Sequence, residues 1–331
     1  MTEPLVSVQG LGRRFDVSAP RLKRWVERLP RQFVQAVDGL DFTVHRGRTL
    51  ALVGESGCGK STVARMVVGL MQPSQGEVRF DGQVVHQTLQ SRHALALRRR
   101  LQMIFQDPYA SLNPRWKVRD IVAEPLREHG LLAHPSDAAQ RVGELLASVG
   151  LSARDGPKFA HQFSGGQRQR ISIARALATQ PEFLVCDEPT SALDVSVQAQ
   201  VLNLMKDLQQ SRQLTYLFIS HNLAVVHHMA DDVGVMYLGR MMEMAPKAEL
   251  FGSPRHPYTR MLLDAIPDVH AHARVRAPVL GEVPNPVSPP AGCAFHPRCP
   301  LAQSRCRHER PLMLWQGANQ VACHAVAEGR G

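Results

Sequence analysis

A glycine-rich segment ending in lysine and serine has the clearest chemical meaning in the sequence. It fits the pattern G-x-x-x-x-G-K-[ST] and consists of Gly54, Glu55, Ser56, Gly57, Cys58, Gly59, Lys60 and Ser61. Glycines let several backbone N–H groups point at one anion, and a helix beginning here adds positive potential. Lys60 is expected to reach the β- and γ-phosphates of a nucleotide and Ser61 to bind Mg²⁺, while Thr62 beside it is expected to contact the nucleotide. We therefore predict a nucleotide-binding loop, in which Cys58 is a tolerated small residue.

Two adjacent carboxylates follow an apolar run further along the chain. Asp187 and Glu188 come directly after Phe183–Cys186, which has the composition of a buried strand. A carboxylate at the end of such a strand suits the Mg²⁺ shell, the role expected for Asp187, while Glu188 would polarise an attacking water. Two exposed acids at a strand end are the plain alternative. The phosphate-binding pattern upstream favours the catalytic interpretation.

A short glycine motif precedes a further helical pattern. It consists of Ser164, Gly165, Gly166 and Gln167, and the helix expected after it runs from Arg168 to Thr179. Ser164 and Gln167 have the spacing of a capping box, S-x-x-Q. The same N–H groups and hydroxyl would also suit a γ-phosphate presented by another subunit, and the two interpretations are compatible.

Two polar residues each follow a strand-like run. Gln106 comes after Leu101–Phe105 and is placed to touch both Mg²⁺ and the attacking water. His221 comes after Thr215–Ser220 and has no local motif of its own, so a structural role is the plain interpretation.

The elements that would position these residues alternate between strands and helices. Strands are expected within 38–55, at Phe183–Cys186 and at Thr215–Ile219. Helices are expected from Ser61 to Met71 and around Gln198–Gln209, and another should begin at Ser136 and stop at Gly150. Alternation of this kind predicts an α/β domain.

The composition is that of a globular protein. The chain has 331 residues, 44% hydrophobic and 21% charged, with a net charge of +10. Its length predicts two domains, which the motifs make unequal in size. No apolar run is long enough to span a membrane and the first residues lack a secretion signal, so a cytosolic chain is expected.

Four of the six cysteines crowd the C-terminal end, after a segment marked by prolines from Pro278 to Pro290. They are Cys293, Cys299, Cys306 and Cys323. Their spacing matches no common zinc ribbon, yet four thiolates suit either Zn²⁺ or a [4Fe–4S] cluster. Free thiols are the third possibility, and the remaining cysteines, Cys58 and Cys186, stand alone.

Over residues 5–250 the sequence resembles the nucleotide-binding domain of ABC transporters. The resemblance rests on the loop at 54–61, Gln106, Ser164–Gln167, Asp187-Glu188, Ser191-Ala192-Leu193-Asp194 and His221, in the family's order. It implies a P-loop fold with a RecA-like core and a helical subdomain at about 107–180, binding ATP and Mg²⁺. It also implies that Glu188 is the catalytic base and that His221 is the switch histidine that senses the γ-phosphate. Asp194 would belong to the loop that couples the two ATP sites, and Phe15 would stack on the adenine. Phe163 stands where the family usually has leucine.

A finer resemblance is to the F-type ATPase subunits of dipeptide and oligopeptide importers. It rests on Gln106–Arg115, on His256–Arg260 with the residues up to Pro267, and on the tail from Leu280 to Pro300. It divides the chain into a nucleotide-binding domain at 1–250 and a small Cys-rich extension at 251–331, and it implies a [4Fe–4S] cluster there. The implied partners are a paralogous ATPase subunit in a heterodimer, two transmembrane permease subunits and an extracellular or periplasmic peptide-binding protein. The implied location is the cytoplasmic face of the bacterial inner membrane, as a peripheral protein.

Two other functions are compatible with an ABC ATPase. Importers of nickel, glutathione or another non-peptide substrate use an almost indistinguishable subunit. A soluble ABC ATPase acting on nucleic acid or the ribosome is disfavoured, because the chain has one phosphate-binding loop and no sustained heptads. We attribute the basic charge to a membrane-proximal and phosphate-handling role, with no nucleic-acid partner.

Overall fold

A mixed eight-stranded sheet forms the centre of the molecule. The computed structural model describes residues 4–134, 136–265 and 281–331. Three residues named in the sequence predictions lie outside this part of the chain: Pro278, the first proline of the expected linker, and Pro267 and Leu280, which bound two of the blocks that carry the family resemblance. The strand order is β11-β12-β10-β9-β3-β8-β7-β6. The strands are β3 (Thr49–Val53), β6 (Leu101–Ile104), β7 (Phe183–Asp187), β8 (Thr215–Ile219), β9 (Asp232–Tyr237), β10 (Arg240–Pro246), β11 (Leu314–Gln316) and β12 (Asn319–Val321).

The middle of this sheet is parallel. Strands β9, β3, β8, β7 and β6 pair in parallel, whereas β10, β12 and β11 extend the sheet in antiparallel fashion. Every residue of β3, β7 and β8 is buried, which is why these strands appear in the sequence as continuous apolar runs. The strands predicted at 183–186 and 215–219 are confirmed within one residue, and the α/β class is confirmed.

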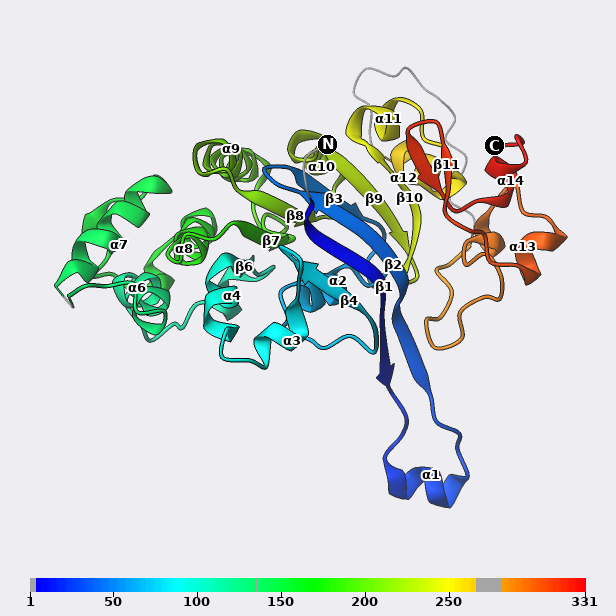
Figure 1. Ribbon diagram of the computed structural model, residues 1–331, viewed down its shortest axis with the longest axis horizontal. Helices are drawn as coiled ribbons and strands as arrows, with labels where there is room; N and C mark the ends of the chain where they lie inside the picture. Colours follow the sequence, from blue (N-terminus) through cyan, green and yellow to red (C-terminus); the bar gives the residue numbers. More distant parts are fainter. Residues whose placement is uncertain (1–3, 135, 266–280) are drawn as a thin grey trace.

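A second, antiparallel sheet is built from strands in the N-terminal part of the chain. Its order is β2-β1-β4-β5. The strands are β1 (Pro4–Asp16), β2 (Phe33–His45), β4 (Gln75–Phe80) and β5 (Gln83–Val84). The segment predicted as strand at 38–55 is thus divided between β2 in this sheet and β3 in the central one. Beyond the sheet, β1 and β2 continue as a ribbon that carries helix α1 (Arg21–Glu27) away from the body (Figure 1).

Helices cover both faces of the central sheet. Those around the core are α2 (Lys60–Val67), α3 (Val85–Leu89), α4 (Ala94–Arg100), α9 (Val195–Arg212), α10 (Leu223–Met229), α11 (Lys247–Gly252) and α12 (Pro257–Asp264). A helical group at one end of the molecule comprises α5 (Pro108–Ser111), α6 (Val118–Glu128), α7 (Asp137–Ser148) and α8 (Gly165–Leu177) (Figure 1). The opposite end holds α13 (Ser304–His308) and α14 (His324–Ala327).

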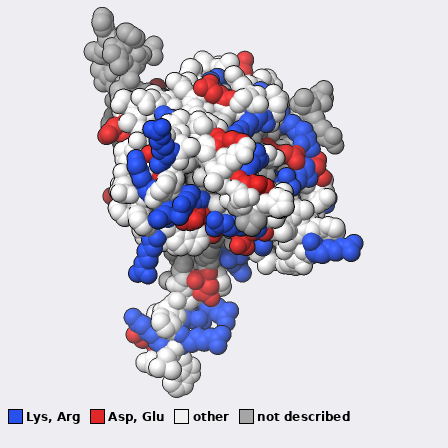
Figure 2. All heavy atoms as spheres, turned by 90° about the vertical axis from the view of Figure 1, so that its left-hand side faces the viewer, with Lys and Arg blue, Asp and Glu red and all other residues white. Residues whose placement is uncertain are grey.

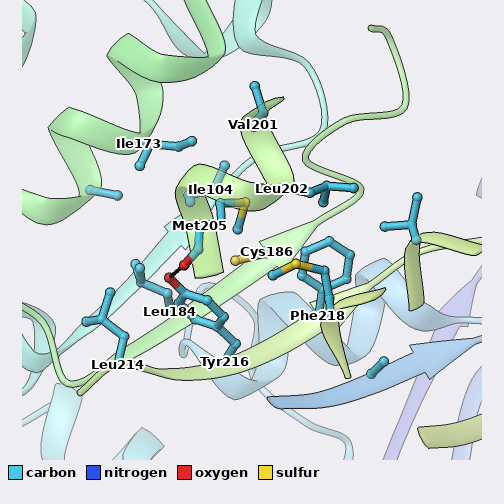
Figure 3. Close-up of a cluster of buried hydrophobic side chains, with 14 of the residues drawn as sticks. Ile104, Ile173, Leu184, Cys186, Val201, Leu202, Met205, Leu214, Tyr216 and Phe218 are labelled. Atoms are coloured by element: carbon cyan, nitrogen blue, oxygen red, sulfur yellow. Dashed lines mark hydrogen bonds between the residues drawn. The ribbon is translucent and has the colours of Figure 1, made fainter. Parts of the chain in front are cut away.

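Buried side chains join α8 and α9 to the sheet (Figure 3). The hydroxyl of Tyr216 on β8 donates a 2.9 Å hydrogen bond to the carbonyl of Met205 on α9. Cys186 on β7 is fully buried in this cluster, and burial raises the pKa of its thiol, so it serves as a small core residue.

Two helix boundaries differ from the sequence predictions. Ser136 does not cap α7 with its side chain; instead the Asp137 carboxylate accepts from the backbone N–H of His134 at 3.0 Å. Helix α2 ends at Val67 and not at Met71, because Gly69 adopts a left-handed conformation with φ +74°. The predicted stop at Gly150, which has φ +72°, is confirmed.

Candidate nucleotide-binding and hydrolysis site

The loop between β3 and α2 borders a cavity of about 480 Å³. The loop residues other than Cys58 between Ser56 and Thr62 line it together with Gln106, Glu188 and His221. Pro286, from the C-terminal extension, also lines it. Side chains predicted from four separate segments of the sequence therefore meet at one site, where the parallel strands end.

The position of the third glycine of the loop accepts no other residue, because of both its backbone conformation and its close neighbours. Gly59 has φ +101°, and a Cβ atom built on it would lie 2.2 Å from the carbonyl oxygen of Ala36 on β2. Any side chain here would collide with that backbone. The close approach fixes the loop between β2 and the start of α2, where backbone N–H groups are free to bind an anion.

Lys60 is held inside the loop, with 5% of its surface exposed. Its ammonium donates to the carbonyl oxygens of Gly54 at 2.8 Å and Glu55 at 3.0 Å. It also lies 3.6 Å from the Cys58 sulfur, and burial raises the pKa of this thiol. The positive charge is therefore already positioned over the loop before any phosphate arrives.

Ser61 and Asp187 form an oxygen-rich pair beside the loop. The hydroxyl of Ser61 donates to Asp187 Oδ1 at 3.0 Å. Burial raises the pKa of Asp187, the Ser61 hydrogen bond opposes this, and the nearby charge of Glu188 adds to it. A hydroxyl and a carboxylate at this distance are the oxygen ligands that Mg²⁺ prefers.

Glu188 is held between two side chains from neighbouring strand ends. The amide of Gln106 donates to Glu188 Oε2 at 3.0 Å, and His221 Nδ1 lies 3.1 Å from Oε1. The backbone of Glu188 has φ +45°, a left-handed conformation that non-glycine residues adopt at a cost of about 1 kcal/mol or more. This turn directs the carboxylate to the cavity while Asp187 remains in the strand.

The glycine motif caps α8 away from the cavity. Gln167 Oε1 accepts from the Ser164 backbone N–H at 3.0 Å, and Ser164 Oγ accepts from the Gln167 N–H at 3.4 Å, so the predicted capping box is confirmed. Gly166 lets α9 approach, because a Cβ there would lie 2.3 Å from Val197 Cγ1. None of Ser164–Gln167 lines the cavity of this chain's own loop. Their phosphate-binding role stays a prediction.

Two further predicted residues lie outside the cavity lining. Phe15 lies on β1, opposite Val34, with the Arg13 guanidinium 4.9 Å from its ring centre. Val34 lines the cavity and Phe15 does not. Asp194 is exposed at the start of α9 and makes no side-chain cap. The adenine-stacking and coupling roles of these residues stay predictions.

The C-terminal extension contacts the loop through two residues that sequence reasoning did not assign to the site. The Arg298 guanidinium donates to both carboxylate oxygens of Glu55, at 2.7 and 2.9 Å, and its pKa is raised by this pairing. The hydroxyl of Tyr258 on α12 accepts from the Glu55 backbone N–H at 3.0 Å. Both lie in blocks quoted for the family resemblance, but nothing in those blocks indicates contact with residue 55.

The extension is joined to the core by strand pairing, by a ring contact and by a buried carboxylate. Strand β12 pairs with β10, and the buried Phe295 packs edge-on against Tyr237 at 5.4 Å between ring centres. The buried carboxylate of Glu243 accepts from the Asn319 side chain at 2.8 Å and from the backbone N–H groups of Arg255 and His256, both at 2.9 Å. Contacts within the chain itself therefore hold the extension against the core.

The four C-terminal cysteines are free thiols. Burial raises the pKa of Cys293 and Cys323, and raises that of Cys299 to about 11. Among the residues described, no group of three or more His, Cys, Asp or Glu side chains is arranged to hold a metal ion. The arrangement of these side chains therefore does not support the predicted zinc or iron–sulfur site at Cys293, Cys299, Cys306 and Cys323.

Sheet, loop and carboxylates together define a P-loop ATPase, and comparison with known proteins narrows the class. The ABC transporter family model matches residues 37–191, and the model for the oligopeptide/dipeptide transporter C-terminal region matches residues 242–306. Among solved structures, the ATP-binding cassette MJ0796 bound to ADP and Pi aligns with TM-score 0.63 at 24% identity over 73% of this chain and 98% of that one. The cbiO1 subunit from Clostridium perfringens aligns with TM-score 0.62 at 25% identity, covering 76% and 92%.

Curated relatives match nearly the whole chain. The di/tripeptide transport ATP-binding protein DppF of Pseudomonas aeruginosa is 49% identical over 99% of this chain and 100% of its own length. The oligopeptide transport ATP-binding protein AppF of Bacillus subtilis is 48% identical, covering 88% and 89%. The chain belongs to the ABC transporter ATP-binding proteins, in the oligopeptide/dipeptide group, and is an ABC ATPase.

Proposed function

We propose that this chain hydrolyses ATP to power the import of dipeptides or oligopeptides across the bacterial cytoplasmic membrane. The observation that carries the proposal is the near-complete alignment with peptide-transport ATP-binding proteins, which includes the C-terminal extension. The grouping of Glu188 with Gln106 and His221 supplies the chemistry.

Each residue of the site has a role in this proposal. Lys60 and the loop N–H groups hold the phosphates, while Ser61 and Asp187 would bind Mg²⁺, which supplies charge neutralisation when present. Glu188 accepts a proton from the attacking water, and Gln106 and His221 orient its carboxylate. No residue forms a covalent bond with the phosphate.

A second ATPase subunit completes the proposed site. Ser164–Gln167 lie outside the cavity of their own chain, which is the arrangement expected if they face the phosphate loop of a paralogous partner. The MJ0796 cassette, similar in fold, is described as dimeric in its own structure. Closure of the two subunits on ATP would move the membrane subunits, and hydrolysis would reset them.

The remaining partners follow from the importer role. Two permease subunits and a peptide-binding protein outside the membrane would complete the transporter, with this chain peripheral on the cytoplasmic face. None of the helices within the described residues is both long and apolar enough to cross a bilayer.

Uptake by a deletion strain tests the proposed function. The strain should lose uptake of peptides of defined length, and regain it with the wild-type chain but not with Glu188→Gln. Nickel and glutathione serve as parallel substrates. Retained peptide uptake with loss of nickel or glutathione uptake would replace the peptide assignment and leave the ATPase role intact.

We further propose that the four C-terminal thiols bind a [4Fe–4S] cluster, with Zn²⁺ as the alternative occupant. Support comes from proximity: the backbone N–H of Cys293 donates to the carbonyl of Cys306 at 2.9 Å, and Cys299 lies close enough to the other three cysteines to interact with each of them. A cluster takes one thiolate per iron, so its ligands stand further apart than those of a single ion. Protein purified without oxygen should contain iron and sulfide, both lost in Cys299→Ser. Protein free of iron and zinc would overturn the proposal.

A further inference from the structure

The tip of the β1–β2 ribbon carries an amphipathic surface whose large apolar side chains are exposed in the described structure. We call residues 17–32, which include α1, the arm. No residue of α1 is buried. Leu22, Trp25 and Val26 are 79%, 83% and 68% exposed, and they follow the i, i+3, i+4 spacing of one helix face. Leu29, which is 40% exposed, comes directly after the helix.

Basic side chains surround this apolar stripe. The arm contains one acidic residue, Glu27, and five basic residues, which are Arg21, Lys23, Arg24, Arg28 and Arg31. Figure 2 shows Lys and Arg side chains gathered on the arm where it projects below the body. The net charge of +4 on this segment is a large part of the +10 carried by the whole chain.

The root of the arm is ordered by backbone pairing. Asp16 and Phe33 are cross-strand partners, and the Val17 N–H donates to the Gln32 carbonyl at 3.0 Å. The Arg14 guanidinium also lies 4.3 Å from the centre of the Phe33 ring. The ribbon therefore presents the helix at a fixed distance from the body and does not fold it back onto the core (Figure 1).

A short helix whose apolar face is exposed is only marginally stable in water. Contact between this apolar stripe and another surface would stabilise it. Tryptophan and aliphatic residues on one face with lysine and arginine around them are the composition of helices that lie in the headgroup region of a bilayer. Anionic headgroups complement the +4 charge, whereas the aliphatic residues offer no stacking surface for nucleic-acid bases. We propose that the arm docks on the anionic lipid surface of the membrane, with the stripe inserted among the headgroups.

This surface is independent of ATP hydrolysis, so its test uses the full chain without nucleotide. The protein is mixed with vesicles of phosphatidylglycerol and phosphatidylcholine, or of phosphatidylcholine alone, and the bound fraction is measured by sedimentation. We expect binding to the anionic vesicles that weakens as salt is raised. In a Trp116→Phe, Trp315→Phe background, the emission of Trp25 should shift to the blue on binding.

Two variants separate the stripe from the charges. The first carries Leu22→Ser, Trp25→Ser and Val26→Ser, and the second replaces the five arm basic residues with glutamine. Each should bind anionic vesicles at least about tenfold more weakly. Trp315→Ser is the matched control, because Trp315 is 67% exposed on β11 and should not matter.

A deletion keeps the test independent of how the substituted helix folds. Replacing residues 17–32 with Asn-Gly joins the cross-strand partners Asp16 and Phe33 by a two-residue turn and should abolish binding. Equal binding to neutral and anionic vesicles, or unchanged binding by the deletion, would overturn the proposal. So would a Trp25 emission that shifts only when a permease or ATPase partner is added, since the occupant would then be protein.

Discussion

Glu188 is the residue on which the proposed hydrolysis depends most directly. Gln106 and His221 hold its two carboxylate oxygens, and all three residues line the cavity. Replacement by glutamine keeps the shape and hydrogen bonding but removes the proton acceptor. We expect Glu188→Gln to bind ATP with affinity close to that of the wild type and to hydrolyse it about 10²–10⁴-fold more slowly.

Nucleotide binding and phosphate release by the purified transporter check this prediction. Glu249→Gln, which changes an exposed carboxylate on α11, is the control. Near-normal turnover by a transporter carrying the change in both ATPase subunits would show that another group takes the proton.

Arg298 links the C-terminal extension to the same loop. Its two hydrogen bonds orient and neutralise the carboxylate of Glu55, a residue of the proposed phosphate-binding loop. Arg298→Met leaves this carboxylate unpaired, and its repulsion of phosphate should raise the KM for ATP about tenfold with little change in kcat. The double variant with Glu55→Gln should recover most of the affinity, because the unpaired charge is gone.

Steady-state kinetics separate this effect from general damage to the extension. Arg305→Met is the matched control, since Arg305 pairs with Glu309 and Glu328 on the exposed side of the extension. An equal rise in KM in Arg305→Met, or no recovery in the double variant, would contradict a role through Glu55.

At the scale of elements, α12 is fixed to the core by a buried histidine. The His256 ring accepts from the Tyr258 N–H at 3.0 Å and so caps α12, and burial lowers the pKa of His256 to about 3. The folded protein therefore keeps the ring neutral while the unfolded chain takes up a proton below about pH 6.5. This contribution to stability is complete above that pH and is lost as the pH falls, by up to about 1.4 kcal/mol per unit.

His256→Asn keeps a capping oxygen and removes the titration. We expect the free energy of unfolding of the wild type to fall by about 1 kcal/mol more than that of the variant between about pH 7.5 and 5.5. Urea unfolding at the two pH values measures it. His134→Asn, at an exposed position, should behave like the wild type. Identical pH dependence in wild type and His256→Asn would contradict the prediction.

Elements buried on both faces were the most predictable from sequence. Strands β7 and β8 are continuous apolar runs because neither face meets water, and the capping box of α8 is local chemistry. The Arg298–Glu55 pair joins residues 243 positions apart, and no local pattern indicates such a contact. Helix α1 was also missed, because its apolar residues are too few and too exposed to mark a core-facing helix.

At the scale of the whole molecule, the proposed function assigns the helical group and the phosphate loop to different ATP sites. Ser164 lies outside the cavity that contains Lys60 and Glu188, so its loss should not affect ATP binding by this chain alone. It should weaken the ATP-dependent pairing of the two ATPase subunits, because a hydroxyl donor to the partner's γ-phosphate is removed. We expect about tenfold weaker pairing for Ser164→Ala in a Glu188→Gln background, which prevents turnover.

Ser152→Ala separates this effect from loss of a helix cap. Ser152 caps the short helical turn Ala153–Asp155 in the same helical group, and it accepts from the Arg154 N–H at 3.2 Å, so its loss carries a comparable local cost of about 1 kcal/mol. Sedimentation of the subunit pair with and without ATP measures both variants. Weaker ATP binding by the isolated Ser164→Ala chain would place the motif in its own site, and equal pairing by both variants would reduce it to a cap. Weaker pairing in Ser164→Ala alone would assign the helical group and the phosphate loop to two ATP sites, so that neither subunit completes a hydrolytic site by itself.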